Sequence, residues 1–506
     1  PEAWAVLGQH LQGSSPYRLQ IDALPSSVAL TLDSSLQGMA VHLPSPLAKD
    51  AASTQALHIN WKSADAGKGA APTQRLQANW GQAVAAQYEV QAPSGAVPPV
   101  VRGLLALGSL PANARLPDAG VQLLVQADVL DAGDWYARLA NVLDSSAKMA
   151  STQSVLKAYL PQRVALRVGR LQLGDRALHS VQAQVERSGS DGWKISGQAQ
   201  ELAGQMEYHN GAAGQSDNLR ARLQRLDWTE AQAAQMNEGL LHAPSSMPAV
   251  DVVVEDFRLR GKALGKLEIN ANNYGAATDA NREWRLNKLA ISSPEAQFSS
   301  TGAWLAGQNR TVLNFNLALQ DAGKLLDRFG QKEVLAKGKG NIEGQISWQG
   351  AITAPDTPSM NGKLQIHVQD GRFLKADPGA AKLLGVLNLQ ALPRRLNLDF
   401  RDVFSQGFAF DFVRGDMQIQ KRLASTNNLQ IKGVNAAVLM EGIADLKEET
   451  QDLHVVVVPE INAGTAALVA TAINPAVGLG AFVAQWLLGK PVAKAATQHL
   501  RITGSW

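Results

Sequence analysis

The stretch Leu313-Asn-Phe315-Asn-Leu317 alternates apolar and polar residues without interruption. Successive side chains of a strand point to opposite faces, so this period of two predicts a strand with one apolar and one polar face. The same pattern recurs three times in the second half of the chain. The apolar residues of these three repeats are Leu364, Ile366 and Val368, then Leu396, Leu398 and Phe400, then Phe408, Phe410 and Phe412.

The first half shows the same alternation in shorter runs, bounded by Gly, Pro, Asn and Asp residues. Its apolar positions include Val28, Leu30 and Leu32, then Leu57, Ile59 and Trp61, then Val164, Leu166 and Val168. Helical spacing occurs in residues 134–143, 322–329 and 376–389 and in the C-terminal tail. Residues 229–248 read as a helix followed by a Pro-bearing linker, and the main internal boundary is expected there.

An apolar sheet face must be covered by another layer or must line a groove. The expected helices are too few to cover the sheet continuously, which leaves a closed sandwich or barrel, a β-solenoid, or an open curved sheet. A solenoid would show a fixed repeat, and a series of sandwiches would need more linkers. The sequence therefore favours a mainly β fold, an elongated and curved antiparallel sheet with residues 1–228 and 249–460 as its two parts.

Composition and charge exclude several classes of function. The chain has 47 Lys and Arg against 44 Asp and Glu, a net charge of +3 that gives no reason to expect a nucleic-acid partner. It contains no Cys, so disulfides, thiolate catalysis and thiolate metal sites are ruled out. The sequence begins at Pro1 without a signal-peptide pattern, so we expect a mature product or a fragment whose membrane anchor lies outside this chain.

Motifs for catalysis and cofactor binding are also missing from the sequence. Gly338, Gly340 and Gly344 loosely imitate a dinucleotide fingerprint, but alternating strand sequence follows them instead of a helix. There is no phosphate-binding G-x-x-x-x-G-K-[ST] motif, no G-x-S-x-G motif, and no pair among the nine His at metal-ligand spacing. We therefore predict a protein that is not an enzyme and uses no cofactor or metal.

The tail, residues 461–506, begins with 29 residues (461–489) that carry no formal charge. Asn474-Pro475 divides this run into two pieces that are each shorter than the about 20 residues of a membrane-spanning helix. Three interpretations stay open: a spanning helix, a helical hairpin that plugs one end of the sheet, and a membrane-contacting lip. The residues expected to contact a membrane are Leu479, Phe482, Val483, Trp486 and Leu487 at helical spacing, with Lys490 and Lys494 beside them for anionic headgroups.

Several segments together resemble the AsmA-like envelope proteins, and the closing ones resemble their YhdP branch. These segments are Gly338-Lys-Gly340-Asn-Ile-Glu-Gly344, Leu364-Gln-Ile366-His-Val-Gln-Asp370-Gly371-Arg-Phe373, Arg394-Arg395-Leu-Asn-Leu-Asp399-Phe400, Ile473-Asn474-Pro475 and Ile502-Thr-Gly504-Ser-Trp506. Upstream, Ser35-Leu36-Gln-Gly38 and Leu116-Pro117-Asp-Ala-Gly120, with Asp131 and Trp135, also resemble that branch. The resemblance thus covers nearly the whole chain, but it is spread thinly over Gly, Asn-Pro and aromatic positions.

The resemblance implies a taco-like β-groove with an apolar floor, lined by the twelve apolar residues of the four repeats given first. It implies a role in moving phospholipid between the inner and outer membranes of Gram-negative bacteria, in the periplasm. The C-terminal end would meet the outer membrane, and an anchor outside this chain the inner one. Two alternatives stay open: a periplasmic scaffold or assembly factor for outer-membrane proteins, and an envelope glycan-binding array of β-sandwiches.

Overall fold

The fold is mainly β, as the alternation predicts. In a computed structural model, the described residues are 10–24, 27–64, 73–91, 100–108, 114–137, 159–174, 176–189, 191–211, 216–228, 247–275, 282–374, 408–433, 436–459 and 497–505. They divide into two compact units, Pro1–His209 and Asn210–Trp506. This division precedes residues 229–248, where the sequence places the internal boundary.

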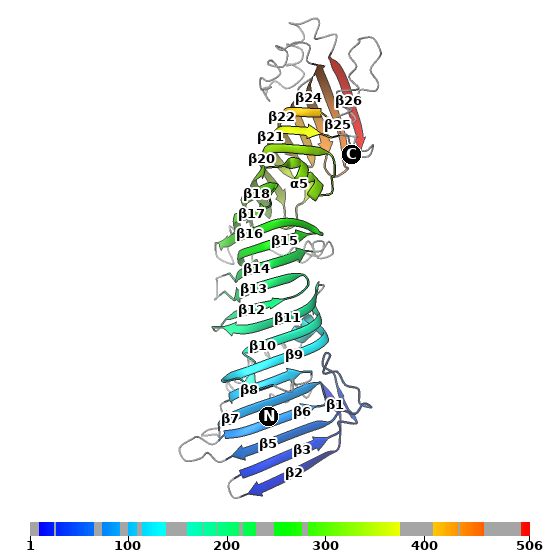
Figure 1. Cartoon of the computed structure of the whole chain (residues 1–506). Helices are drawn as coiled ribbons and strands as arrows, with labels where there is room; N and C mark the ends of the chain where they lie inside the picture. The colour runs from blue at the N-terminus through cyan, green and yellow to red at the C-terminus, as the bar shows by residue number, and fades with distance from the viewer. Residues whose placement is uncertain are drawn as a thin grey trace. The chain divides into compact units, whose positions relative to one another are not determined.

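The sheet of the first unit is built from strands that each pair with the next in the chain (Figure 1). Its strands are β2 (Tyr17–Leu24), β3 (Ser27–Ser34), β5 (Leu57–Ala64), β6 (Thr73–Trp80), β7 (Val84–Gln91), β8 (Val100–Leu107), β9 (Gly120–Asp131), β10 (Arg163–Leu173), β11 (Arg176–Ser188), β12 (Gly192–Gln198) and β13 (Leu202–His209). A small separate sheet joins β1 (Leu11–Gly13) to β4 (Met39–Val41).

The second unit repeats this arrangement with longer strands. They are β14 (Asn218–Trp228), β15 (Ala249–Leu259), β16 (Lys262–Tyr274), β17 (Glu283–Ser292), β18 (Ala296–Leu305), β19 (Arg310–Leu319), β20 (Leu335–Gln349), β21 (Asn361–Phe373), β22 (Phe408–Gln420), β23 (Leu423–Gly433), β24 (Ala436–Asp445), β25 (Thr450–Pro459) and β26 (Gln498–Ser505). Helix α5 (Ala322–Arg328) lies within the expected range 322–329, and a single 3₁₀ turn, η2 (Thr357–Ser359), precedes β21. The expected helix 376–389 is outside the described residues.

Three strand pairs depart from the predicted antiparallel arrangement: β8–β9, β9–β10 and β14–β15 are parallel. A hairpin cannot join parallel neighbours, because the chain must first return to the starting edge through a crossover. The last two connections span residues 132–162 and 229–248. The first contains the expected helix 134–143, and the second is the expected helix and linker. Of the first connection, residues 132–137 and 159–162 are described, and residues 132–137 are helical. The parallel pairings therefore require a crossover between β9 and β10 and between β14 and β15.

Register gives the second sheet one apolar face. Phe298, Leu317, Ile342 and Ile366 are paired in succession across β18, β19, β20 and β21. Residues directly opposite each other on neighbouring strands present their side chains on the same face, so these four share one face. Their neighbours along the strands lie on the other face and are mostly polar.

The C-terminal strands differ because they are apolar on both faces. Val438 and Leu439 are neighbours on β24, so their side chains point to opposite faces, yet they are only 2% and 1% exposed. Val455 and Val456 on β25 are 0% exposed. A continuous apolar run is typical of strands that are buried on both sides. The tail residues Leu479, Phe482, Val483, Trp486, Leu487, Lys490 and Lys494 lie outside the described residues.

Candidate functional site

The candidate site is an apolar strip on the sheet of the second unit, along β18 to β22. One row of it is Phe298, Leu317, Ile342 and Ile366, described above. The neighbouring row pairs Phe315 with Gly344, Gly344 with Leu364, and Leu364 with Met417. Apart from the glycine, every side chain of both rows is partly exposed. We call these two rows the apolar strip.

Glycines on neighbouring strands leave space for the large side chains of the strip to lie close to the sheet. A Cβ atom built on Gly344 would lie 2.8 Å from the Cβ of Leu364, and one built on Gly302 would lie 2.6 Å from Cδ2 of Leu313. Large side chains therefore lie down over the backbone of a glycine on the adjacent strand, a space that any other residue would fill. Phe315 adds a stacked contact with Phe298, with ring centroids 6.4 Å apart.

Helix α5 borders the strip on one side. Its Leu325 and Leu326 pack against the hydrophobic cluster that contains Leu335 and Val368. Asp321 caps the helix by accepting a 3.0 Å hydrogen bond from the backbone N–H of Lys324. The helix thus covers one margin of the apolar face.

Arg328 fastens the last turn of α5 to the edge of the sheet. Its Nη2 donates to both carboxylate oxygens of Glu295 at 2.8 Å, and its Nη1 donates to the carbonyl oxygen of Ala263 at 2.5 Å. The hydrogen bond from Arg328 holds the pKa of the Glu295 carboxyl below its ordinary value of 4.5. This partly buried ion pair fixes the position of the helix on the sheet.

The connection between β20 and β21 borders the other side. Its Ala351 is 5% exposed and belongs to a cluster with Trp284 and Trp304. Trp348 Nε1 donates to the carbonyl oxygen of Ala351, and Thr311 Oγ1 donates to that of Gly350, both at 2.8 Å. Leu313 and Ile352 pack against the same cluster, so the connection lies on the apolar face. The partly exposed strip thus lies between helix α5 and the β20–β21 connection, both of which are held to the sheet by hydrogen bonds.

Eleven of the twelve predicted lining residues fall into three groups. Leu313, Phe315, Leu317, Leu364 and Ile366 lie on the apolar face and are partly exposed. Val368, Phe408 and Phe410 are buried members of the cluster under α5, with exposed fractions of 8%, 4% and 3%. Leu396, Leu398 and Phe400 lie outside the described residues.

The prediction that Phe412 shares a face with Phe408 and Phe410 is wrong. A β-bulge between Phe410 and Phe412 shifts the register against β23, and Val413 packs against the buried cluster instead. Phe412 pairs with the polar residues Gln369 and Lys432. The guanidinium carbon of Arg414 lies 4.3 Å from the centre of its ring, a cation–π contact.

Sequence reasoning missed three members of the strip: Phe298, Ile342 and Met417. Phe298 stands between Gln297 and Ser299, so a weak alternation was present there. Ile342 stands in a glycine-rich stretch where alternation is diluted, and Met417 was hidden by the register change on β22. Only the pairing of strands identifies these residues as neighbours of Leu317 and Leu364.

The first unit also has an apolar face of this kind. Leu32 pairs with Ile59, Leu30 pairs with Trp61, and Trp61 pairs with Leu76. Next in this row is Tyr88, whose ring lies 2.6 Å from the position that a Cβ on Gly103 would occupy. Tyr88 Oη donates to the carbonyl oxygen of Tyr159 at 3.1 Å, and burial raises the pKa of Tyr88 to about 12.

The opposite faces carry cross-strand ion pairs. Glu89 on β7 accepts from Arg75 on β6 at 2.6 Å and from Arg102 on β8 at 2.6 Å. The hydrogen bond from Arg102 is the largest cause of the lowered pKa of the Glu89 carboxyl. Within the described ranges, no three His, Asp or Glu side chains come close enough together to hold a metal ion. In the same part of the chain, no helix has the length and apolarity needed to cross a membrane.

Comparison with known proteins gives a family match over nearly the whole chain. The model of the family described as "YhdP protein" matches residues 2–506. A curated relative, the intermembrane phospholipid transporter YhdP of Escherichia coli (strain K12), is 24% identical over 487 residues. The aligned region is 94% of this chain and 36% of the relative, so the chain spans about a third of the relative's length.

Proposed function

Since the chain belongs to the YhdP protein family, we propose that its one-sided sheet carries the acyl chains of phospholipids between the membranes of a Gram-negative envelope. The observation that supports this proposal best is the apolar strip, partly exposed between α5 and the β20–β21 connection. Acyl chains lie along this strip as a groove floor, while the headgroup stays in water. The chain acts in the periplasm and performs no catalysis.

The energetics of acyl chains explain why such a floor is needed. Moving a chain of about sixteen methylenes from an apolar environment into water costs about 13 kcal/mol. A floor of Leu, Ile, Phe and Met side chains offers nearly the environment of the bilayer interior. Transfer between bilayer and floor is therefore close to thermoneutral, and no covalent step is needed along the strip.

The dimension of the sheet suits this role. The second unit alone has strands β14 to β26 side by side. Thirteen strands at ~4.8 Å each extend about 60 Å in the stacking direction. In this proposal the C-terminal end faces the outer membrane, and the uncharged tail with Phe482 and Trp486 acts there as a plug or a membrane-contacting lip. The inner membrane is reached through parts of the longer protein.

Site-specific crosslinking to lipid tests the floor directly. A photoreactive amino acid is placed at Phe315 or Ile366 on the apolar strip, and at Asn314 or Gln365 as matched controls. Each control is one residue away on the same strand and points to the opposite face. We expect phospholipid adducts, identified by mass spectrometry, at the first two positions only.

Two results would contradict the proposal. One is equal labelling of both faces. The other is a purified chain that carries no stoichiometric phospholipid and forms no adduct at Phe315 or Ile366. Either would favour the alternatives of a scaffold or a glycan-binding array.

A further inference from the structure

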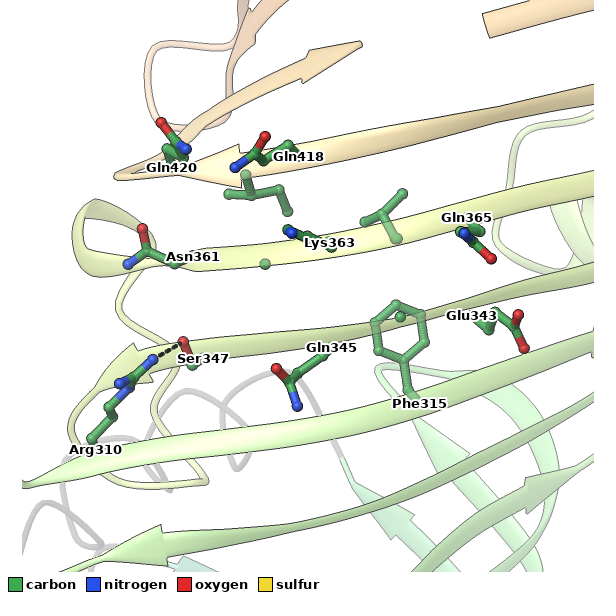
Figure 2. A pocket seen from close by; sticks show the side chains of 14 residues that line it. Arg310, Phe315, Glu343, Gln345, Ser347, Asn361, Lys363, Gln365, Gln418 and Gln420 are labelled. Carbon is green, nitrogen blue, oxygen red and sulfur yellow. Dashed lines mark hydrogen bonds between the residues drawn. The ribbon is translucent and has the colours of Figure 1, made fainter. Parts of the chain in front are cut away.

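The polar face of the second sheet contains a hollow lined by rows of polar side chains, and its lining also includes Phe315, Gly344 and Leu364 of the apolar strip. It lies over β19 to β22 and has a volume of about 710 Å³ (Figure 2). Gln345, Lys363 and Gln418 are direct partners across three strands, and Ser347, Asn361 and Gln420 form the next row. Gln345 also pairs with Asn314, the neighbour of Phe315 on β19, so these rows lie on the face opposite the apolar strip. We call this hollow the polar cavity.

The strand geometry spaces these side chains regularly. Neighbouring strands are about 4.8 Å apart, and residues i and i+2 along one strand are about 7 Å apart. The cavity thus presents two rows of three polar side chains each, with Gln365 beginning a third row two residues beyond Lys363. A ligand that runs across the strands meets a new polar side chain at each strand.

Several of these side chains have hydrogen-bonding capacity to spare. Among the described residues, the side chains of Gln365, Gln418, Gln420 and Lys363 form no hydrogen bond or ion pair with another part of the chain. Some amides elsewhere on the polar faces are paired, as Asn287 is with Asn270 at 3.0 Å. Within the described residues, the hollow gathers three unpaired amides, Gln365, Gln418 and Gln420, on two neighbouring strands.

The charges of the cavity argue against an anionic ligand. Arg310 donates to Ser347 Oγ at 2.9 Å (Figure 2), and Glu343 accepts from Asn316 at 3.3 Å, so both are already engaged. With Lys363 the lining carries one net positive charge. Phosphate, nucleic acid and anionic membrane surfaces are bound by clusters of Arg and Lys, which this cavity does not have.

Neutral amides suit a ligand rich in hydroxyl groups. Each Gln or Asn side chain offers two N–H donors and one carbonyl acceptor, and each hydroxyl is itself both donor and acceptor. We propose that the polar cavity binds a neutral glycan chain that runs across β20, β21 and β22. An extended peptide would instead pair with the edge of a sheet, and these strands are interior.

This site goes beyond the proposed lipid transport and does not depend on it. Glycan binding on one face would hold the sheet against a polysaccharide layer while the other face stays free for lipid. The amides tested below, Gln365 and Gln418, are not members of the apolar strip, so their substitution leaves the side chains of the strip in place and the two assays report separately.

Calorimetric titration of the full chain tests the proposal with two probes: the β-1,4-linked hexamer of N-acetylglucosamine and maltohexaose. Preference for one probe distinguishes an amino-sugar chain from a glucan. Gln418→Leu and Gln365→Leu should each weaken binding about tenfold, since each removes hydrogen bonds to the ligand. Gln297→Leu is the matched control, an exposed Gln on β18 that faces the same side outside the cavity.

Three results would overturn the glycan site. The first is no saturable binding of either hexasaccharide at millimolar concentration. The second is the same affinity for Gln418→Leu and Gln297→Leu. The third is displacement of the hexasaccharide by a polar peptide of higher affinity, which would make a protein the ligand. Thermal melts of each variant show whether the sheet is intact.

Discussion

Replacing Phe315 by Asp places a negative charge in the middle of the apolar strip without removing a fully buried side chain. Phe315 is partly exposed, so Phe315→Asp forfeits only part of the ~1.5–3 kcal/mol of a buried apolar side chain. Loss of the stacked contact with Phe298 adds ~0.5–1.5 kcal/mol. The total, about 2–3 kcal/mol, is smaller than the roughly 5–15 kcal/mol that stabilises a typical domain. The variant should therefore fold with a lowered melting temperature.

The effect on lipid should be much larger than the effect on folding. A carboxylate pressed against acyl chains loses hydration worth several kcal/mol. A penalty of about 3 kcal/mol slows passage roughly 100-fold, since each ~1.4 kcal/mol is a factor of ten. Contact with lipid also raises the pKa of the new carboxyl, so passage should recover as the pH is lowered and the group becomes neutral.

The assay follows a fluorescent phospholipid from donor to acceptor vesicles, together with the amount of lipid bound to the purified chain. Asn314→Asp is the matched control: it adds the same charge one residue away, on the opposite face, and keeps the acceptor for Gln345. We expect near-normal transfer by Asn314→Asp and severely reduced transfer by Phe315→Asp. Equal transfer by both variants, with both folded, would refute the assignment of this face to lipid.

Three further predictions address the margins of the strip, the first unit and the tail. Glu295→Gln should lower the free energy of unfolding by about 1–3 kcal/mol at neutral pH, because it breaks the charged hydrogen bonds to Arg328. The pKa of Glu295 is depressed in the folded state, so the difference in stability between wild type and variant should shrink as the pH falls below 4.5. Thermal melts measure this difference, and a difference that stays constant with pH would contradict the prediction. Gly103→Ala should destabilise the first unit by about 1–3 kcal/mol in urea titrations because the Tyr88 ring occupies the space of the new methyl, whereas Gly189→Ala, with nothing within 4 Å, should show only the strain of its positive φ. Phe482→Ser combined with Trp486→Ser should leave bound lipid unchanged but reduce delivery to acceptor vesicles, and unchanged delivery would limit the tail to a structural role.

Two other variants would be poor tests of the lipid path. Phe410→Asp would bury a charge at a position that is 3% exposed, so it would unfold the cluster under α5 rather than report on lipid. Deleting residues 461–506 would remove β26, which pairs with β25 and covers Leu453 and Val455. Point substitutions at Phe315, Phe482 and Trp486 avoid both problems.

The sequence predicts the strands well because alternation and strand period coincide. It predicts which side of β19 and β21 is apolar, since Leu313, Phe315 and Ile366 stand in regular register. It could not predict which apolar residues stay partly exposed, because exposure depends on where α5 and the β20–β21 connection come to lie. The sequence likewise could not show which neighbouring strands are parallel, because strand direction depends on the path of the connections rather than on the residues of the strands.

Bulges occur where the alternation of apolar and polar residues is interrupted, and there they keep the apolar side chains on one face of the sheet. On β17, Leu286 and Leu289 are three residues apart, a spacing that would place them on opposite faces of a regular strand. A register shift between them lets Leu286 be buried while Leu289 packs against the same cluster, and Asn287 and Lys288 between them are exposed. The bulge thus returns the apolar side chains to the same face of the sheet after an irregular spacing in the sequence.

The same correction occurs on β15, where Val254 and Phe257 are 0% and 4% exposed on either side of a register shift. In both strands, two polar residues stand between two apolar ones. Strand pairing alone would be satisfied by regular strands, so these bulges serve the continuity of the apolar face rather than the ladder of hydrogen bonds. A sheet that preserves one apolar face through repeated changes of register is what a continuous path for acyl chains requires.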